Sequence, residues 1–503
     1  MGAGRACEGL RAAWQGHLKT VVKECGFRYL RFHGLFHDDM FVYREVEGRI
    51  VYNFQYVDEL FDKMLEIGIR PFVEFGFCPG DLASEKETIF WWKAHGAPPK
   101  DYDKWGQLID KTVRHWVDRY GIDEVRKWYF EVWNEPNLWP FFHGTKSQYF
   151  ELYKVTAEAI KKIDGGLRVG GPATSNFVPD DRFDGEKEDH TCHRKAIEAK
   201  DLDQLDWRPV WVEQFLIYCE KNGLPVDFVS AHPYPTDWAL DDLGKGRRLA
   251  RGVGATPRDL ALLRRIVDEG PFPKAEIHLT EWNTSPSPRD FAHDTLQAAT
   301  YVVKANIDSI GSVDSLAYWT FTDIFEEGGA GDTIFHGGFG MINFQGIMKP
   351  VFHAYRFLNS LGDRILSRGN GYVITRNSDN GNLVGLAYHY PSEMKQFAPG
   401  SFGPRGITEE ALSQCRHENL TIKLEGVKPH ATFMLEILDS EHGNALASWR
   451  SMGQPDCPTR EQTEVLKDAS QATLKEIVYA DENGMILIER IINPWSIILI
   501  QQI

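Results

Sequence analysis

Two glutamates, each close to an asparagine and a tryptophan, stand at the ends of apolar stretches of the sequence. Glu135 follows the run Trp128-Tyr-Phe-Glu-Val-Trp-Asn134, and Glu281 follows Ile277-His-Leu-Thr280. Aromatic and β-branched runs of this kind are typical of buried strands, and Pro136 ends the first one because it has no N–H to donate. A lone strand-end glutamate is usually a paired structural charge. Two in the same context indicate a pair of carboxyls that work together.

Such a pair suits the hydrolysis of a glycosidic bond. One carboxyl protonates the leaving oxygen, and the other attacks the anomeric carbon or activates a water molecule. Asn134, next to Glu135, can donate a hydrogen bond to a sugar 2-hydroxyl, and that contact strengthens in the transition state. The separation that distinguishes retention (~5–5.5 Å) from inversion (~6.5–9.5 Å) does not follow from sequence.

The elements that must position these residues alternate regularly. Apolar periodicity predicts helices at 8–24, 53–67, 102–120, 147–163, 208–221, 257–269 and 292–309. It predicts strands at 27–34, 70–77, 128–135, 167–172, 226–234, 276–282 and 315–321. This alternation indicates parallel strands with helical crossovers, and polar residues at strand ends are typical of a (β/α)8 TIM barrel. The eighth strand is the first in the chain, Gly2-Ala-Gly-Arg5, which is short or truncated.

The rhythm changes after the barrel. Short strands separated by turn residues are predicted at 372–376, 382–388, 420–424, 432–438 and 495–500. This pattern favours an antiparallel β-sandwich. We therefore expect a catalytic barrel over residues 1–360 and a β-sandwich accessory domain over 361–503. The polar segment 180–206 is interpreted as a surface insertion in the barrel.

The amino-acid composition limits the kinds of molecule that this protein is expected to bind. The net charge of −16 argues against nucleic acid, and the 15 tryptophans favour a carbohydrate, because sugar rings stack on aromatic faces. We therefore expect a small oligosaccharide as partner, with no nucleic acid and no membrane, and a homo-oligomer is left open. Seven cysteines without a CxxC pair, and a start without an apolar leader, favour a reduced cytoplasmic protein. No metal or organic cofactor is expected.

Several segments together resemble the family 39 glycoside hydrolases, and that family's β-xylosidases in particular. These segments are Arg31-Phe-His-Gly-Leu-Phe-His-Asp-Asp39, Arg70-Pro-Phe-Val-Glu-Phe-Gly-Phe77, Glu131-Val-Trp-Asn-Glu-Pro-Asn-Leu138, His278-Leu-Thr-Glu-Trp-Asn-Thr-Ser285, Tyr318-Trp-Thr-Phe-Thr-Asp-Ile-Phe-Glu-Glu327, Phe335-His-Gly-Gly-Phe-Gly340 and Leu438-Asp-Ser-Glu-His-Gly-Asn-Ala445. The resemblance covers almost the whole chain. It implies a retaining mechanism with Glu135 as acid/base and Glu281 as nucleophile.

The same resemblance implies a set of contacts to the sugar at the cleaved bond: His33, Asn134, His232, Tyr234, Trp319 and Glu327. Each has a plainer interpretation as a packed or hydrogen-bonded strand-end residue. Glu326 is an alternative to Glu327 as the acceptor of a sugar hydroxyl. Glu74 is interpreted as a structural carboxylate that holds an arginine.

The leading hypothesis is a retaining, exo-acting β-D-xylosidase that releases xylose from the non-reducing ends of xylo-oligosaccharides. The same mechanism on another sugar remains open, as an α-L-arabinosidase, β-glucosidase or uronidase. Ala231 stands where related enzymes carry arginine, and the loss of that cation counts against a uronic acid. A catalytically silent sugar-binding barrel is the alternative from another class.

Overall fold

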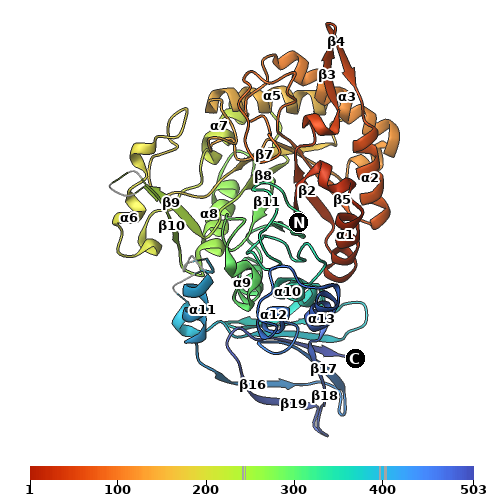
Figure 1. Ribbon diagram of the computed structural model, residues 1–503, viewed down its shortest axis with the longest axis vertical. Helices are drawn as coiled ribbons and strands as arrows, with labels where there is room; N and C mark the ends of the chain where they lie inside the picture. Colours follow the sequence, from red (N-terminus) through yellow and green to blue (C-terminus); the bar gives the residue numbers. More distant parts are fainter. Residues whose placement is uncertain (241–242, 244, 396–397, 401–404) are drawn as a thin grey trace. The chain divides into compact units, whose positions relative to one another are not determined.

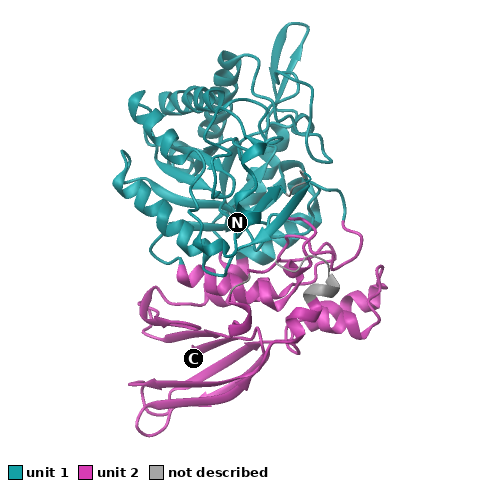
Figure 2. Cartoon of the chain, turned by 90° about the vertical axis from the view of Figure 1, so that its left-hand side faces the viewer, with its two compact units in different colours: residues 1–22, 27–286, 309–330 teal, residues 23–26, 287–308, 331–503 magenta. Residues whose placement is uncertain are grey.

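The computed structural model describes residues 1–240, 243, 245–395, 398–400 and 405–503. The chain forms two compact units (Figure 2). Residues 1–22, 27–286 and 309–330 make up the first unit, and residues 23–26, 287–308 and 331–503 make up the second. The division of the chain at residue 360 remains a prediction.

Eight strands of the first unit form one sheet, in which neighbours are parallel and spatial order follows the chain (Figure 1). They are β1 (Gly2–Arg5), β2 (Tyr29–His33), β5 (Arg70–Phe75), β6 (Tyr129–Val132), β7 (Arg168–Thr174), β8 (Phe228–Ala231), β11 (Glu276–Trp282) and β12 (Ser315–Tyr318). Just after β12, the Phe321 N–H donates to the Gly2 carbonyl of β1 at 3.0 Å, so the last strand returns to the first. The predicted (β/α)8 barrel is confirmed, and its first strand is the four-residue β1.

Helices separate these strands along the chain. They are α1 (Ala12–Cys25), α2 (Gln55–Ile67), α3 (Tyr102–Tyr120), α4 (Ile122–Val125), α5 (Lys146–Ile163), α6 (Lys195–Glu198), α7 (Val212–Lys221), α8 (Ala255–Glu269) and α9 (Leu296–Asp308), with short 3₁₀ turns η1 (Ala6–Leu10), η2 (Asp38–Met40), η3 (His190–Cys192), η4 (Leu202–Gln204) and η5 (Phe291–Asp294). Residues that stabilise helix termini stand at the ends of these helices. The Asp101 carboxylate accepts from the Lys104 N–H at 3.0 Å and caps α3. Gly68 ends α2 with a φ of 97°, a conformation that suits glycine.

The barrel interior is layered because side chains of a strand alternate between its two faces. Tyr29, Phe72, Tyr129 and Phe228 form an aromatic layer, in which the Phe72 and Tyr129 rings stack at 4.8 Å. Two residues further along three of these strands come Arg31, Glu74 and Glu131, all buried. The aromatic layer therefore forms an apolar floor, and a charged layer lies above it toward the carboxyl ends of the strands.

Two hairpins of the first unit were not predicted. One pairs β3 (Tyr43–Val46) with β4 (Arg49–Tyr52), and the other pairs β9 (Thr236–Leu240) with β10 (Gly246–Ala250). Both are short and rich in charged residues, so their sequences lack the apolar run of a barrel strand. The segment predicted as a surface insertion, 180–206, contains η3, α6 and η4.

The second unit contains an antiparallel six-stranded sheet, in the order β13-β14-β15-β20-β17-β18, and a two-stranded ribbon. The sheet strands are β13 (Arg364–Gly369), β14 (Tyr372–Arg376), β15 (Leu383–Tyr388), β17 (Thr432–Leu438), β18 (Leu474–Tyr479) and β20 (Ile497–Gln502); the ribbon is β16 (Glu418–Glu425) and β19 (Met485–Ile492). Its helices are α10 (Pro350–Asn359), α11 (Arg405–Ser413), α12 (Ala445–Ser451) and α13 (Arg460–Gln471), with the 3₁₀ turn η6 (Ser392–Met394). The predicted antiparallel C-terminal part is confirmed.

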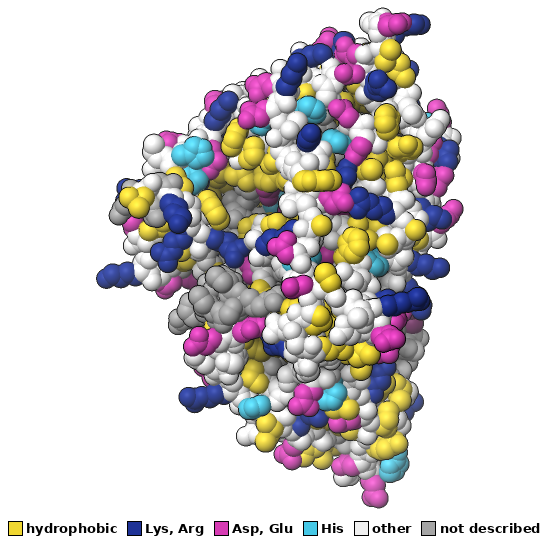
Figure 3. All heavy atoms as spheres, viewed as in Figure 1, with side chains coloured by type: hydrophobic (Ala, Val, Ile, Leu, Met, Phe, Trp, Pro, Cys, Tyr) yellow, Lys and Arg dark blue, Asp and Glu magenta, His cyan; other side chains and the backbone are white. Residues whose placement is uncertain are grey.

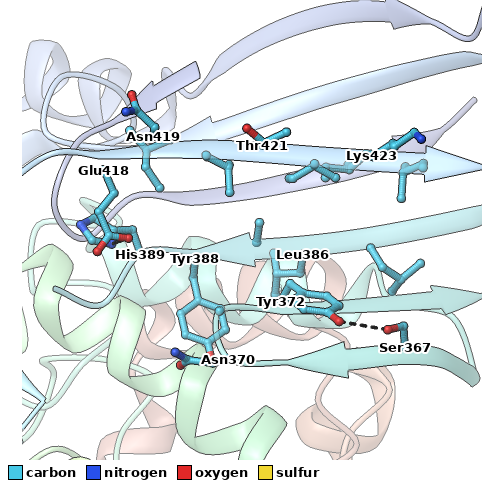
Figure 4. Close-up of a pocket in the computed structure, with 18 of the residues that line it drawn as sticks. Ser367, Asn370, Tyr372, Leu386, Tyr388, His389, Glu418, Asn419, Thr421 and Lys423 are labelled. Carbon is cyan, nitrogen blue, oxygen red and sulfur yellow. Dashed lines mark hydrogen bonds and ion pairs between the residues drawn. The ribbon is translucent and has the colours of Figure 1, made fainter. Parts of the chain in front are cut away.

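The ribbon packs against the sheet through aliphatic side chains, among them Leu435, Ile488 and Ile500. Beside this core a cavity of about 570 Å³ opens between β16 and strands β14 and β15 (Figure 4). At its edge the Tyr372 and Ser367 hydroxyls lie 3.1 Å apart, as the dashed line in Figure 4 marks. The two layers of this unit therefore pack closely only over part of their length.

The surface carries charges of both signs. On the face shown in Figure 3, acidic and basic side chains are interspersed with apolar ones. In the described part of the chain, no helix combines the length and the apolar composition that crossing a membrane requires.

Candidate active site

Both predicted catalytic carboxylates lie buried at the carboxyl end of the barrel. Glu281 belongs to β11, and Glu135 follows β6, where Trp133 and Glu135 adopt positive φ values of 69° and 43°. The Glu135 N–H donates to the Ala173 carbonyl at 2.8 Å, which holds this bend. One oxygen of each carboxylate and a ring nitrogen of His232 lie within 4.8 Å of one another. Two strands that are far apart in the sequence thus bring the pair together.

Arg31 is the centre of the charged layer beneath the pair. Its Nε donates to Glu131 at 2.6 Å. Its Nη2 lies 2.9 Å from Glu74 and donates to the side-chain oxygen Oδ1 of Asn134 at 2.8 Å. Its Nη1 reaches Glu281 Oε2 at 3.4 Å. One buried guanidinium therefore contacts three carboxylates, and its planar donors fix their orientation. Glu74 holds an arginine, as its sequence context indicates.

A hydrogen-bonded chain determines where the proton of Glu135 resides. The Thr280 hydroxyl donates to Glu131 at 2.7 Å, so it can only accept from His232 Nε2, 3.0 Å away. Burial, followed by the charges of Arg31 and His33, lowers the pKa of His232 well below 6.5, so the ring is neutral. A neutral ring that donates through Nε2 has a bare Nδ1, and that atom lies 3.0 Å from Glu135 Oε1. This contact is a hydrogen bond only when Glu135 is protonated.

The surroundings of the two carboxylates also favour a proton on Glu135 and a negative charge on Glu281. Burial and the negative charge of Glu281 raise the pKa of Glu135 well above 4.5. Burial also raises the pKa of Glu281, but Arg31, His33 and the Tyr234 hydroxyl, which donates at 2.7 Å, all act against that rise. Glu135 therefore retains its proton where Glu281 is ionised, the arrangement of an acid beside a nucleophile.

The other predicted sugar contacts surround this pair. Besides Asn134, His232 and Tyr234, the buried ring of Trp319 lies 4.7 Å from the His33 ring. The His33 Nδ1 binds Glu74 at 2.6 Å, and its Nε2 lies 3.6 Å from Glu327 Oε1. The structure thus brings all the predicted residues into one site.

The two alternative acceptors, Glu326 and Glu327, point in different directions. Glu326 pairs with Arg11 at 2.6 Å and with Arg5 at 3.0 Å. Glu327 lies beside His33 with its side chain 16% exposed, and desolvation together with the charge of Glu281 raises its pKa well above 4.5. Glu327 is therefore the one that faces the site, and in its neutral form it can donate as well as accept.

Sequence reasoning missed Arg31, Glu131 and Thr280 as parts of the site. Each sits inside an apolar strand rather than at its end. The available signal was a charged residue at an inward-facing position, as with Arg31 two residues before His33 in β2. The three groups Glu135, His232 and Glu281 are close enough to share a metal ion, but His232 Nδ1 already faces Glu135 and the Arg31 charge repels a cation.

A parallel barrel with this carboxylate pair defines a barrel glycoside hydrolase. The model of glycosyl hydrolases family 39 matches residues 1–486, so the chain belongs to that family and the resemblance seen in the sequence is confirmed. The chain is 37% identical to a beta-xylosidase of Geobacillus stearothermophilus, over 100% of this chain and 91% of the relative. It is also 37% identical to a beta-xylosidase of Caldicellulosiruptor saccharolyticus, over 99% and 93%.

Solved structures agree with this assignment. The GH39 enzyme from Xanthomonas axonopodis pv. citri superposes with a TM-score of 0.84 at 33% identity, over 100% of this chain and 92% of that one. A monomeric beta-xylosidase from Caulobacter crescentus CB15 has the same TM-score at 32% identity, over 100% and 94%. The barrel and its C-terminal part are therefore both features of the family.

The rate of hydrolysis should show a bell-shaped dependence on pH. The predicted roles require ionised Glu281 and protonated Glu135, so the acidic limb should report the pKa of Glu281 and the alkaline limb that of Glu135. Tyr234→Phe removes a donor that stabilises the Glu281 carboxylate, so the pKa of Glu281 should rise. We expect the acidic limb of kcat/KM to move up by about one pH unit, since such a bond contributes roughly 1.5 kcal/mol and one unit is about 1.36 kcal/mol. The alkaline limb should not move. If the substitution shifted the alkaline limb instead, that limb would have to be assigned to Glu281 and the acidic limb to Glu135.

Replacing Arg31 by methionine should damage both stability and catalysis. The change leaves Glu74 and Glu131 buried without their cation, which typically costs about 3–5 kcal/mol of unfolding free energy. Denaturant unfolding at neutral pH measures this loss. Arg114, which is exposed and paired with Asp110 one helical turn earlier, is a matched control, and its replacement should cost far less stability than that of Arg31. Equal losses for the two variants would show that the charged layer does not depend on Arg31.

Proposed function

We propose that this glycoside hydrolase is a retaining, exo-acting β-D-xylosidase that releases xylose from the non-reducing ends of xylo-oligosaccharides. The observation that carries the mechanism is the spacing of Glu135 and Glu281, whose nearest oxygens lie within 4.8 Å. Retention needs carboxyls about 5–5.5 Å apart, whereas inversion needs about 6.5–9.5 Å to admit a water molecule. In the first step Glu281 attacks the anomeric carbon while Glu135 gives its proton to the leaving oxygen. In the second step Glu135 takes a proton from water, which attacks the same carbon and breaks the bond between the sugar and Glu281, so that the Glu281 carboxylate and the free sugar are released.

The choice of sugar rests on the relatives at 37% identity over nearly the whole chain, both of them beta-xylosidases. The buried state of Glu135 and Glu281 supports exo action, because a closed pocket holds one terminal sugar where an open cleft would expose its carboxylates. Asn134, whose carbonyl oxygen is held by Arg31, can donate through its amide nitrogen to the 2-hydroxyl of the bound sugar.

We also propose that the partner is a small neutral oligosaccharide and that the enzyme contributes to xylan degradation in the cytoplasm. All seven cysteines lie among the described residues and are unpaired, which suits a reducing compartment. Cell fractionation with an antibody against the chain tests the location.

A panel of aryl glycosides tests the sugar. The β-D-xyloside should give the highest kcat/KM, above the α-L-arabinoside, the β-D-glucoside and a uronide. Proton NMR of the first product should show β-xylose before mutarotation. Xylotriose labelled at its reducing end should first release unlabelled xylose. Faster hydrolysis of another glycoside, α-xylose as first product, or labelled xylose first would overturn the sugar, the mechanism or the exo action respectively.

A further inference from the structure

Three potential metal ligands converge in the inserted segment of the first unit, away from the catalytic pair. Glu188, His190 and His193 each present one ligand atom, and these atoms all lie within 4.8 Å of one another. Glu188 Oε1 lies 2.6 Å from His193 Nε2 and 4.0 Å from His190 Nδ1. A zinc ion with bonds of about 2.0–2.2 Å spans roughly 4 Å between opposite ligands. The three side chains are therefore close enough to share one ion.

The second observation is the state of the His193 ring. Its Nδ1 lies 3.3 Å from the Trp238 carbonyl oxygen, which only accepts, and 3.5 Å from Arg182 Nη1, which only donates; Nδ1 carries the proton in the tautomer that bonds the carbonyl. In a neutral ring Nε2 then has a lone pair directed away from that carbonyl. The side chain is 6% exposed, and Nε2 makes an ion-pair contact of 2.6 Å with Glu188 Oε1 that lies outside hydrogen-bonding geometry. A histidine that donates through one nitrogen to a backbone carbonyl and directs the other at a second potential ligand is arranged as metal ligands usually are.

The electrostatic surroundings admit a cation. Arg182 is a positive group beside this cluster, with Nη1 3.5 Å from His193 Nδ1. Its charge is balanced by two buried carboxylates, Asp180 at 2.5 Å and Asp237 at 3.1 Å. The Glu188 charge therefore remains available to a bound ion.

We propose that Glu188, His190 and His193 form a binding site for a divalent transition metal ion such as Zn²⁺. Two imidazoles and one carboxylate are a ligand set that zinc accepts, with a fourth position left for water. The proposal departs from the sequence-based expectation of no metal. That expectation rested on cysteines without metal-type spacing, and the polar segment that holds these three residues was interpreted as a surface insertion.

The bound ion would fasten the inserted segment to the β9 hairpin. The His193 carbonyl accepts from the Leu240 N–H at 3.2 Å, and its ring contacts Trp238 of the same strand. β9 begins at Thr236, two residues after Tyr234, whose hydroxyl binds Glu281. The ion therefore stabilises a segment that continues into the wall of the catalytic site, without touching the reacting groups.

Titration of the chelator-treated full chain with Zn²⁺ by calorimetry tests this. We expect one ion per chain with a Kd of about 1 μM or tighter. His190→Ala should weaken binding at least about tenfold, and since His190 is 65% exposed its loss should leave the fold intact. Zn²⁺ should raise the midpoint of thermal unfolding of the unmodified chain but not that of His190→Ala. Co²⁺ in place of Zn²⁺ should give a visible absorption band that the same variant lacks.

His417→Ala, at an exposed histidine of the second unit, is the matched control and should bind as the unmodified chain does. Two results would overturn the proposal. One is a chain that binds no Zn²⁺ at micromolar concentration. The other is a stoichiometry and affinity that His190→Ala and Glu188→Gln leave unchanged while Glu281→Gln abolishes them, which would place the ion at the catalytic pair.

Discussion

Replacing Glu281 by alanine should abolish turnover of every substrate, whatever its leaving group. The side chain supplies the bond that displaces the leaving group, and no other described carboxylate occupies its position beside Arg31 and Tyr234. We expect kcat/KM for an aryl β-xyloside to fall at least about 10⁴-fold, which corresponds to roughly 5 kcal/mol of transition-state stabilisation. Steady-state kinetics with a chromogenic xyloside measure this, and circular dichroism shows whether the fold persists.

Added azide should restore turnover to the Glu281→Ala variant, so the experiment tests for a gain of activity as well as a loss. A small anion can occupy the space that the alanine leaves and attack the anomeric carbon from the same side as Glu281. Because Glu135 remains to protonate the leaving group, the product should be the α-xylosyl azide, inverted relative to the β-xyloside. Glu213→Ala, at an exposed carboxylate of α7, should keep full activity and give no azide product. Restored turnover with β-xylosyl azide as product would mean that Glu281 is not the nucleophile.

The two carboxylates were predictable because the signal lay in short stretches of sequence. Each glutamate ends an apolar strand, and in a parallel barrel all such ends meet at one face, so two distant positions converge without any knowledge of side-chain geometry. Arg31 was not predictable in the same way. Its role depends on strands β2, β5, β6 and β11 facing a common interior, and the sequence of β2 alone does not reveal which carboxylates lie opposite.

The fold likewise has elements that were predictable from the sequence and elements that were not. The barrel strands were found because they are buried on both faces and therefore read as continuous apolar runs. β13 was missed because it is an exposed edge strand, and the β3–β4 hairpin because its strands are short and charged. Glu326 and Glu327 could not be separated by sequence, since adjacent residues in a loop have no fixed alternation. The structure distinguishes them through the pairing of Glu326 with Arg5 and Arg11.

Replacing Glu135 by alanine should instead give a loss that depends on the leaving group. A dinitrophenol leaves without protonation, so formation of the glycosyl-enzyme at Glu281 should remain fast, while its hydrolysis loses the base that activates water. We expect a burst of dinitrophenol followed by slow turnover. Xylobiose has a poor leaving group that needs the Glu135 proton, and its rate should fall by about 10²–10⁴-fold, the usual contribution of general acid–base catalysis. Stopped-flow measurement of the burst and product analysis for xylobiose give the two rates.

The azide product separates this variant from Glu281→Ala. In Glu135→Ala the covalent intermediate still forms, and azide attacks it from the face that Glu135 has vacated, so the product should be the β-xylosyl azide with retained configuration. The alkaline limb of the pH–rate profile should also disappear, because the group whose deprotonation produces it is gone. Glu135→Gln keeps the shape of the side chain but has no proton to transfer, so it should show the same dependence on the leaving group. Equal losses for dinitrophenyl xyloside and xylobiose would mean that the acid/base lies elsewhere. Glu327 is then the next candidate, since it lies beside His33 with a raised pKa.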